Sequence, residues 1–519
     1  MAKQSTYILV LVLAVGAVMS GFGQAKAIEN QFFPAPDTDE QFQTPAFKKS
    51  GFTKYQEMLN FLEELRDQQP EMVTLDWIGY TAKGRRIPIV HINKGEADGK
   101  VKVWYQGGVH GNEPASTEGM LHFMNLLVTD EVNHSLLDDV SLAVVPMVNI
   151  DGFIVLERQL ANGKDLNRDQ AKLQTQEAQV LRAAYNEFQP QVVVDFHEYN
   201  PYRADFRDMD VKGTTSFYDF MFLPSNNLNQ TPPIRELSQD LFMANAESHM
   251  SNQGFNSTLY KTVAFWRGHK FFNQGGTSPR SSASAYALTN AVSILMEIRG
   301  VGLMKQNLKR RVYITKELAF NYLKTANEHA DLVREKIQAS LDYIQTSDDP
   351  IVVRSEPIGK ESTFKMIDLN TRSAKEYPII LKERSNQRIL IDRSRAEGYF
   401  IEGSYAKAIE KLKQLGLEMT LLTTSREVKC DRYLVEELVT NRSGFEGINT
   451  LEVEVALKGT QKLFAPGTYY VSSRQKNGQL LTELLEPDAD NSFLRMRIVE
   501  LGENMEYKIY RTSEKSDLP

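Results

Sequence analysis

The feature that most constrains the fold is a series of short, continuous apolar runs that alternate with helical patterns. Strands are predicted over residues 101–109, 141–149, 191–196 and 291–298, and helices over 117–127 and 175–188. Uninterrupted Val and Ile runs are typical of strands buried on both faces, and intervening helices connect parallel neighbours. The sequence therefore predicts an α/β fold with a mixed, mainly parallel sheet flanked by helices.

The character of the chain changes near residue 347. Before it, a long helical pattern covers about 307–345, whereas after it short alternating runs such as 378–381 and 451–456 indicate strands. A chain of 519 residues is long enough for two to four domains. We therefore expect a first domain over residues 28–346 and a β-rich accessory domain over residues 347–519.

The first residues have the form of a secretion signal. A lysine at position 3, an apolar run from position 7 and the sequence Ala25-Lys-Ala27 match the charged start, apolar core and cleavage site of a signal peptide. We expect residues 1–27 to be removed from an exported bacterial protein that is periplasmic or secreted. A retained membrane anchor is the alternative, although the run is shorter than the roughly 20 residues that span a bilayer.

Composition argues against several kinds of partner. The formal net charge is −7 and no Lys/Arg cluster stands out, which argues against nucleic acid. No later apolar stretch is long enough for a membrane span, so none is expected in the mature chain. Cys430 is the only cysteine, so an intrachain disulfide cannot form. The oligomeric state is left open.

Four polar residues stand at the ends of the predicted strands. His110 and Glu113 follow the strand at 101–109, His197 follows the strand at 191–196, and Glu297 closes the strand at 291–298. Because open α/β sheets bind ligands at the carboxyl ends of their strands, these side chains should meet there. Two imidazoles and one carboxylate leave one position open, as in a catalytic zinc site. We expect one zinc ion per chain, held by His110, Glu113 and His197.

Further motifs resemble those of the zinc carboxypeptidase family, in the family's order, over about residues 55–336. They are Asn149-Ile-Asp-Gly152, Arg158, Asp165-Leu-Asn-Arg168 and Met296-Glu-Ile-Arg299. Residues 398–400, 415–416 and 484–487 resemble the accessory region of the larger exported bacterial members. The resemblance implies the family's α/β fold, its zinc chemistry and peptide substrates with a free C-terminal carboxylate.

The resemblance also implies roles for the remaining motif residues. Glu297 would act as general base, and Arg158 would stabilise the oxyanion of the intermediate. Asn167 and Arg168 would bind the terminal carboxylate of the substrate. Asp165 would accept the second N–H of His110. Three alternatives remain: a Glu297 ion pair with Arg299, a plain surface position for Arg158, and a local turn role for Asp165.

One departure from the animal enzymes of this family affects the expected specificity. The tyrosine that closes over the substrate in those enzymes has no counterpart between Tyr260 and Tyr286. Tyr286 is a candidate substitute, with a core position as its alternative. Arg280 is a candidate cation facing the substrate, with an inert loop position as its alternative.

The function expected from these features is that of a zinc metallocarboxypeptidase. It would hydrolyse C-terminal peptide bonds with metal-activated water. A zinc-dependent deacylase of N-acyl amino acids is the nearest alternative, since its substrates also carry an α-carboxylate. A non-catalytic binding protein on the same fold is a further alternative, although such proteins tend to lose the ligands or the base that this chain retains.

Overall fold

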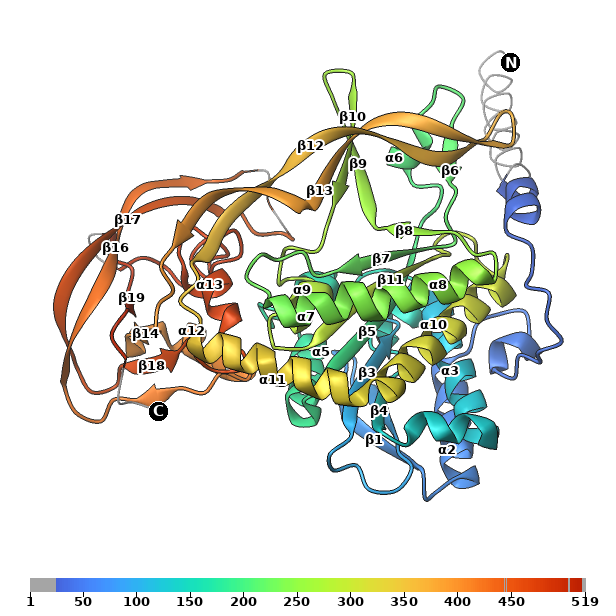
Figure 1. The fold of residues 1–519 in the computed structure, drawn as a ribbon, viewed down its shortest axis with the longest axis horizontal. Helices are drawn as coiled ribbons and strands as arrows, with labels where there is room; N and C mark the ends of the chain where they lie inside the picture. The colour runs from blue at the N-terminus through green and yellow to red at the C-terminus, as the bar shows by residue number, and fades with distance from the viewer. Residues whose placement is uncertain (1–24, 443, 445, 503–504, 516–519) are drawn as a thin grey trace, which may run out of the picture.

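The computed structural model describes residues 25–442, 444, 446–502 and 505–515 (Figure 1). Most of the predicted signal peptide, residues 1–24, therefore lies outside the described residues. No helix in the described ranges is long and apolar enough to cross a membrane.

A central sheet of eight strands forms the framework, in the order β1-β2-β4-β3-β5-β11-β7-β8. The bounds are β1 Val73–Tyr80, β2 Arg86–Ile92, β3 Val101–Gly107, β4 Val140–Val145, β5 Val192–Tyr199, β7 Phe220–Pro224, β8 Ser257–Leu259 and β11 Val292–Arg299. The central strands β4, β3, β5 and β11 are parallel, whereas β1, β2 and β7 pair antiparallel. All residues of β4 and β5 are buried, as expected for strands covered on both faces.

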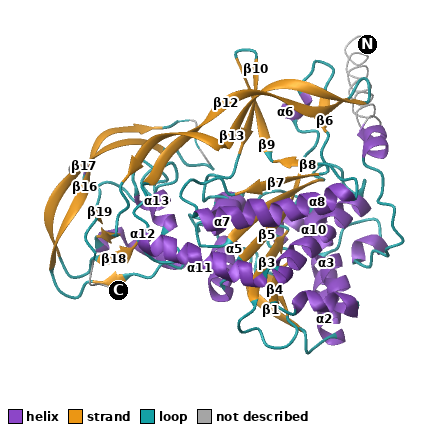
Figure 2. Ribbon diagram, viewed as in Figure 1, coloured by secondary structure: helices purple, strands orange, loops and turns teal. Residues whose placement is uncertain are grey.

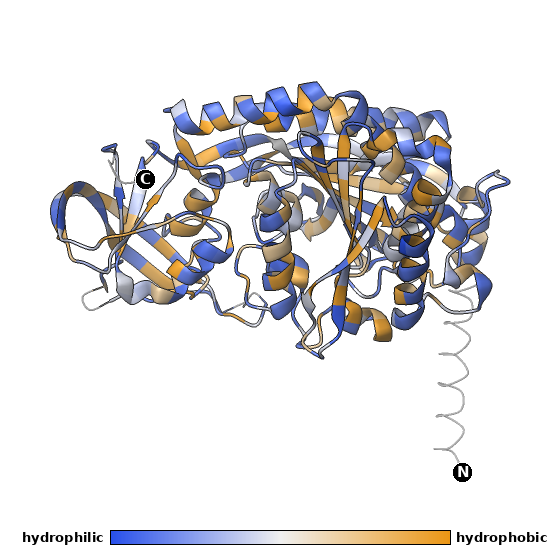
Figure 3. Ribbon diagram, turned by 90° about the horizontal axis from the view of Figure 1, so that it is seen from below, coloured by the Kyte–Doolittle hydropathy of each residue, from blue (hydrophilic) through white to orange (hydrophobic). Residues whose placement is uncertain are grey.

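Helices cover both faces of this sheet (Figures 2 and 3). They include α2 Tyr55–Gln68, α3 Pro114–Thr129, α5 Gln176–Phe188, α10 Leu308–Glu328 and α11 Ala330–Thr346. A π-helical turn, Leu237–Met243, lies between α7 Pro232–Glu236 and α8 Ala244–Asn252. Apolar residues run along the central strands in Figure 3. The predicted α/β architecture is confirmed.

The C-terminal region is rich in strands, as predicted. A six-stranded sheet has the order β15-β18-β14-β19-β16-β17. Its bounds are β14 Gly398–Ile401, β15 Thr420–Leu421, β16 Arg426–Thr440, β17 Leu451–Phe464, β18 Tyr469–Ser472 and β19 Ile509–Thr512, with helices α12 Ala406–Gln414 and α13 Gln479–Leu485 nearby. Cys430 is buried in β16.

A long hairpin links this region to the first part of the chain. Its strands β12 (Ile351–Asp368) and β13 (Ser373–Arg393) extend back over the central sheet (Figure 1). There β12 pairs with β6 (Thr214–Ser216), and β13 pairs with β10 (His269–Gln274), which in turn pairs with β9 (Lys261–Trp266). One sheet thus combines strands from both sides of residue 347, and the division into domains there stays a prediction.

A buried ion pair anchors the start of the described chain to strand β11 of the central sheet. Residues 25–32 form a helix, and the fully buried Glu29 lies 2.5 Å from Arg299 Nη2. Arg299 Nη1 also donates to the carbonyl of Ser216 at 2.7 Å. The alternative that Arg299 pairs with Glu297 is therefore wrong, because the guanidinium is occupied by Glu29.

We predict that Glu29→Ala destabilises the fold strongly, because the buried Arg299 cation loses its carboxylate. Breaking a buried pair from one side costs about 3–5 kcal/mol. Urea denaturation would measure the change. Glu328→Ala is the matched control, since the Glu328–Lys324 pair is more than half exposed at 3.7 Å and should contribute about 0.5 kcal/mol. Equal, small effects of both changes would contradict the structural role of Glu29.

Candidate metal centre

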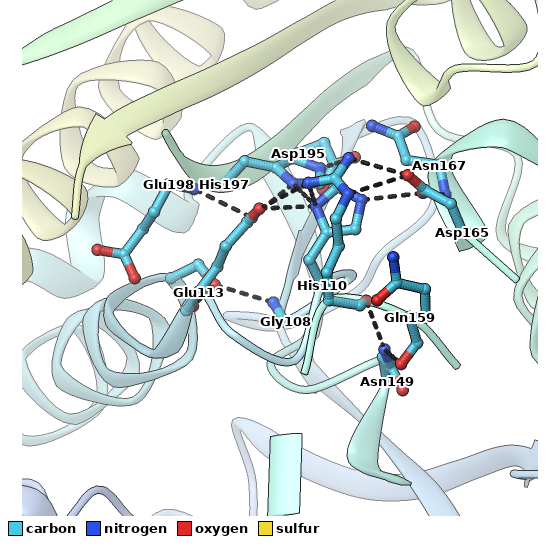
Figure 4. Close-up of polar contacts among 12 residues, drawn as sticks. Gly108, His110, Glu113, Asn149, Gln159, Asp165, Asn167, Asp195, His197 and Glu198 are labelled. Carbon is cyan, nitrogen blue, oxygen red and sulfur yellow. Dashed lines mark hydrogen bonds and ion pairs between the residues drawn. The ribbon is translucent and has the colours of Figure 1, made fainter. Parts of the chain in front are cut away.

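Three side chains converge at the carboxyl edge of the central sheet (Figure 4). His110 and Glu113 lie on the loop between β3 and α3, and His197 lies near the end of β5. His110 Nδ1 is 2.7 Å from Glu113 Oε1, and His197 Nδ1 is 2.8 Å from Glu113 Oε2. All three are buried, and one ligand atom from each lies within 4.8 Å of the others. The sequence-predicted ligand residues are thus brought together.

A second layer of carboxylates holds both imidazoles from behind. Asp165 Oδ1 is 3.0 Å from His110 Nε2, and Asp195 Oδ2 is 2.9 Å from His197 Nε2. Each imidazole therefore donates its Nε2–H outward to a carboxylate, and its Nδ1 faces inward as the atom that would bind a metal. Sequence reasoning missed Asp195. Its signal was present, because residues two apart on a strand share a face, and Asp195 precedes His197 by two.

The inward-facing atoms fit a divalent metal. The Nδ1 atoms of His110 and His197 are 3.0 Å apart, and each also lies within 2.8 Å of a Glu113 oxygen. A metal cation in the place of the imidazole protons would be held by both nitrogens and the carboxylate. Burial alone would raise the pKa of Glu113, but the imidazoles of His110 and His197 outweigh it and hold that pKa well below its usual range. Once a metal replaces the imidazole protons, the ionised carboxylate and the two neutral imidazoles form a donor set that suits zinc.

The loop that carries His110 and Glu113 depends on close backbone contact. A Cβ on Gly111 would lie 2.1 Å from the backbone carbon of Gly152. Gly152 in turn donates its N–H to the side chain of Asn149 at 2.9 Å. The amide of Asn149 also donates to the carbonyl of Arg158 at 3.2 Å. The Asn149–Gly152 motif thus fixes the backbone that carries Arg158.

Arg158 lies against the ligand group. Its Nη2 and Nε are 2.9 and 3.0 Å from Asp165 Oδ2, and its Nη1 is 3.3 Å from Glu113 Oε1. The side chain keeps 35% of its surface exposed. Asp165 therefore contacts both His110 and Arg158, and Arg158 is not an isolated surface residue.

Glu297 stands directly opposite His197 in the parallel pairing of β11 with β5. The residue is partly exposed. Burial of the carboxyl raises its pKa to about 7, an effect to which Glu113 adds and which His197 opposes. In the part of the chain that the structure describes, no side chain donates a hydrogen bond to this carboxylate. Glu297 is therefore left for a water molecule or a substrate.

The residues predicted to bind the substrate carboxylate lie beside this group. Asn167 donates its backbone N–H to Asp165 at 2.8 Å and accepts a hydrogen bond from the N–H of Ser282 at 2.8 Å. Burial and the nearby charge of Arg168 together lower the pKa of Arg280 to about 10. Arg168 and Arg280 are thus neighbouring cations, both half-buried.

Tyr286 does not join the group. It is fully buried, its ring lies 4.4 Å from that of Tyr185, and its hydroxyl donates to Gln106 at 3.3 Å. This position favours the core alternative over a role in closing on a substrate.

Tyr260 lies closer to the site than Tyr286 does. Burial raises the pKa of the Tyr260 hydroxyl, and the charge of Glu297 adds to this effect. Its hydroxyl accepts a hydrogen bond from Arg203 at 3.2 Å. Sequence spacing gave no signal for Tyr260.

Residues 58–211 match the family model described as zinc carboxypeptidase. Over 470 residues the chain is 28% identical to carboxypeptidase 2 of Trichophyton rubrum, covering 89% of this chain and 87% of the relative. Carboxypeptidase 2 of Trichophyton equinum is 27% identical with the same coverage. A carboxypeptidase A structure from Helicoverpa armigera covers 60% of this chain and 82% of that chain, with 17% identity and a TM-score of 0.43.

The sequence matches and the ligand group confirm the predicted resemblance to the zinc carboxypeptidases. The chain is a zinc metallopeptidase, and zinc is its cofactor. The full-length relatives named above come from Trichophyton species, so the bacterial origin expected from the sequence stays a prediction.

We predict that Asp195→Asn weakens zinc binding by about 10- to 100-fold, because His197 loses the carboxylate that orients it. Competition with a chromogenic chelator would measure the affinity. Asp208→Asn is the control, since the Asp208 side chain is 57% exposed and pairs only with Arg207 among the described residues. An unchanged zinc affinity in Asp195→Asn would remove the orienting role.

Proposed function

We propose that this zinc metallopeptidase is a carboxypeptidase that removes the C-terminal residue of peptides, with Glu297 as general base. The observation that carries the proposal is the position of Glu297. It lies opposite His197 across the β5–β11 pairing, is partly exposed, and has a pKa raised by burial to about 7. A carboxylate with such a pKa can both accept and return a proton near neutral pH.

The metal site supplies the first part of the chemistry. His110, Glu113 and His197 would hold a zinc ion, which would supply a bound water with a pKa lowered towards about 7 and would polarise the scissile carbonyl. Asp165 and Asp195 keep both imidazoles in the orientation that binding requires, through their contacts of 3.0 and 2.9 Å. The ligand side chains are therefore positioned before the substrate arrives.

Glu297 and Arg158 act on the reacting groups. Glu297 accepts a proton from the attacking water and later delivers it to the nitrogen of the leaving amine. Arg158 donates hydrogen bonds to the oxygen that becomes negatively charged, and Asp165 holds its guanidinium ready for this. Loss of one such donor typically costs about 10²–10³ in kcat.

Asn167 and Arg168 bind the terminal carboxylate of the substrate. The planar guanidinium of Arg168 can donate two parallel hydrogen bonds to a carboxylate, which gives direction as well as affinity. A site that grips the α-carboxylate selects the end of a chain over its interior. Arg280 adds a second cation on the same side, where it favours anionic groups of the substrate.

The protein is proposed to act outside the cytoplasm, because its N-terminal sequence has the pattern of a signal peptide.

Deacylation of N-acyl amino acids uses the same carboxylate contact, but the relatives that align over most of the chain are named carboxypeptidases. Digestion of a peptide library separates the two activities. Stepwise loss of C-terminal residues that stops with a chelator and returns with zinc is expected. Release of acyl groups alone would support the deacylase.

We predict that Glu297→Gln keeps zinc but lowers kcat by about 10³-fold or more, because the amide cannot accept the proton. Peptide hydrolysis and metal analysis of the same preparation would measure both effects. Glu63→Gln, at an exposed position of helix α2, is the matched control. Zinc loss from Glu297→Gln would instead make Glu297 a ligand or a support of the metal site.

We predict that Arg168→Ala raises KM by about 100-fold for peptides with a free C-terminal carboxylate, since a charge-assisted bidentate contact is lost. C-terminally amidated versions of the same peptides should show little further change. Steady-state kinetics on both series would measure the difference, with Arg207→Ala on the exposed surface as the control. Equal effects on both series would remove the carboxylate-binding role.

A further inference from the structure

The segment between β10 and helix α9 (Ser282–Ala287) lies next to the residues proposed to bind the substrate carboxylate. At its end, Ser282 donates its N–H to Asn167 Oδ1 at 2.8 Å. Just before that, the carbonyl of Arg280 accepts the N–H of Gln170 at 3.2 Å. The position of this segment therefore sets where Arg280 lies relative to Asn167 and Arg168.

The opposite side of the segment is held by residues from far along the chain. Ser278 donates its hydroxyl hydrogen to Asn491 Oδ1 at 2.8 Å, and Arg280 Nε donates to Ser278 Oγ at 3.0 Å. The carbonyl of Thr277 accepts a hydrogen bond from Asn227 Nδ2 at 2.7 Å. A chain of hydrogen bonds thus connects Arg280 to the C-terminal region through one serine and one asparagine.

Glu483 of α13 joins the two amides that reach this segment. Its Oε1 accepts a hydrogen bond from Asn227 Nδ2 at 2.6 Å, and its Oε2 accepts one from Asn491 Nδ2 at 2.9 Å. Glu483 is only 7% exposed. One buried carboxylate therefore fixes both Asn227 and Asn491. Asn227 bonds directly to Thr277 of the segment, and Asn491 bonds directly to Ser278.

Several hydrogen bonds span this junction. A cavity of about 210 Å³ lies here, lined by Asn227, Thr277, Glu483 and Asn491 among other residues. Burial and the charge of Arg168 both disfavour the charged form of Arg280, while Asp490 of the C-terminal region favours it. The proximity of Arg280 to Arg168 therefore has an electrostatic cost. Contacts of Arg280 with the C-terminal region offset this cost.

We propose that Glu483 and Asn491 are positioning residues for substrate binding, which hold the 277–280 segment so that Arg280 stays beside Arg168. The inference rests on the proposed carboxypeptidase function, because Arg168 is the proposed contact of the substrate carboxylate. It gives the C-terminal region a direct part in forming the substrate site.

The test measures binding separately from turnover. Full-length, zinc-loaded Glu297→Gln protein serves as the background, and calorimetry gives Kd for one peptide with a free C-terminal carboxylate and for its amide. Adding Asn491→Ala removes both the acceptor for Ser278 and a donor to Glu483. We expect Kd of the free-carboxylate peptide to rise about 5- to 10-fold, with the amide affected less than about twofold.

Control variants separate positioning from general destabilisation. Asn477→Ala removes a buried asparagine whose amide bonds the carbonyls of Leu415 and Gly416, away from the segment, and should leave both Kd values unchanged. Ser278→Ala should reproduce the effect of Asn491→Ala, and Ser278→Thr, which keeps the hydroxyl, should restore tight binding.

The outcomes distinguish the inference from the function on which it rests. Unchanged binding in Asn491→Ala and Ser278→Ala, or equal weakening of acid and amide, overturns the positioning role while leaving the carboxypeptidase proposal intact. If the background protein binds the acid no better than the amide, the carboxylate-binding proposal itself fails, and the positioning role fails with it.

Discussion

The pairing of three parallel strands determines where every reactive group lies. Strand β5 pairs with β3 on one side and with β11 on the other, and His197 stands opposite Glu297 in that register. The loop that follows β3 then brings His110 and Glu113 to the same edge. A shift of β11 by one residue would turn Glu297 to the other face of the sheet, away from His197. Strand register is thus the constraint on which the metal site and the proposed general base both depend.

Four carboxyl groups converge around the two imidazoles: Glu113, Asp165, Asp195 and Glu297. Arg158 contacts two of them, Glu113 and Asp165. Burying carboxylates without compensation is costly, so a bound divalent cation stabilises the surrounding fold as well as the reacting groups. The buried Glu29–Arg299 pair lies two residues beyond Glu297 on the same strand and ties that strand to the start of the described chain.

Local patterns predicted much of the framework. The helices expected over residues 117–127 and 175–188 are α3 and α5, and His110, Glu113 and His197 lie at the strand ends where apolar periodicity placed them. Periodicity and motif spacing report on neighbours along the chain, so they could not show which distant segments meet. The partner of Arg299, the contact between Ser278 and Asn491, and the pairing of β10 with β13 all depend on tertiary contacts. Tyr260 was missed for the same reason, since a turn between β8 and β9 brings it near Glu297.

The β12–β13 hairpin makes the choice of expression boundaries a structural question. Its strands supply the neighbours of β6 and β10, so a chain cut near residue 347 would leave the edges of both strands without hydrogen-bond partners. Exposed edges of this kind recruit other chains and promote aggregation. The smallest piece suited to crystallisation or directed evolution is therefore one that retains the hairpin and the C-terminal sheet from which it extends.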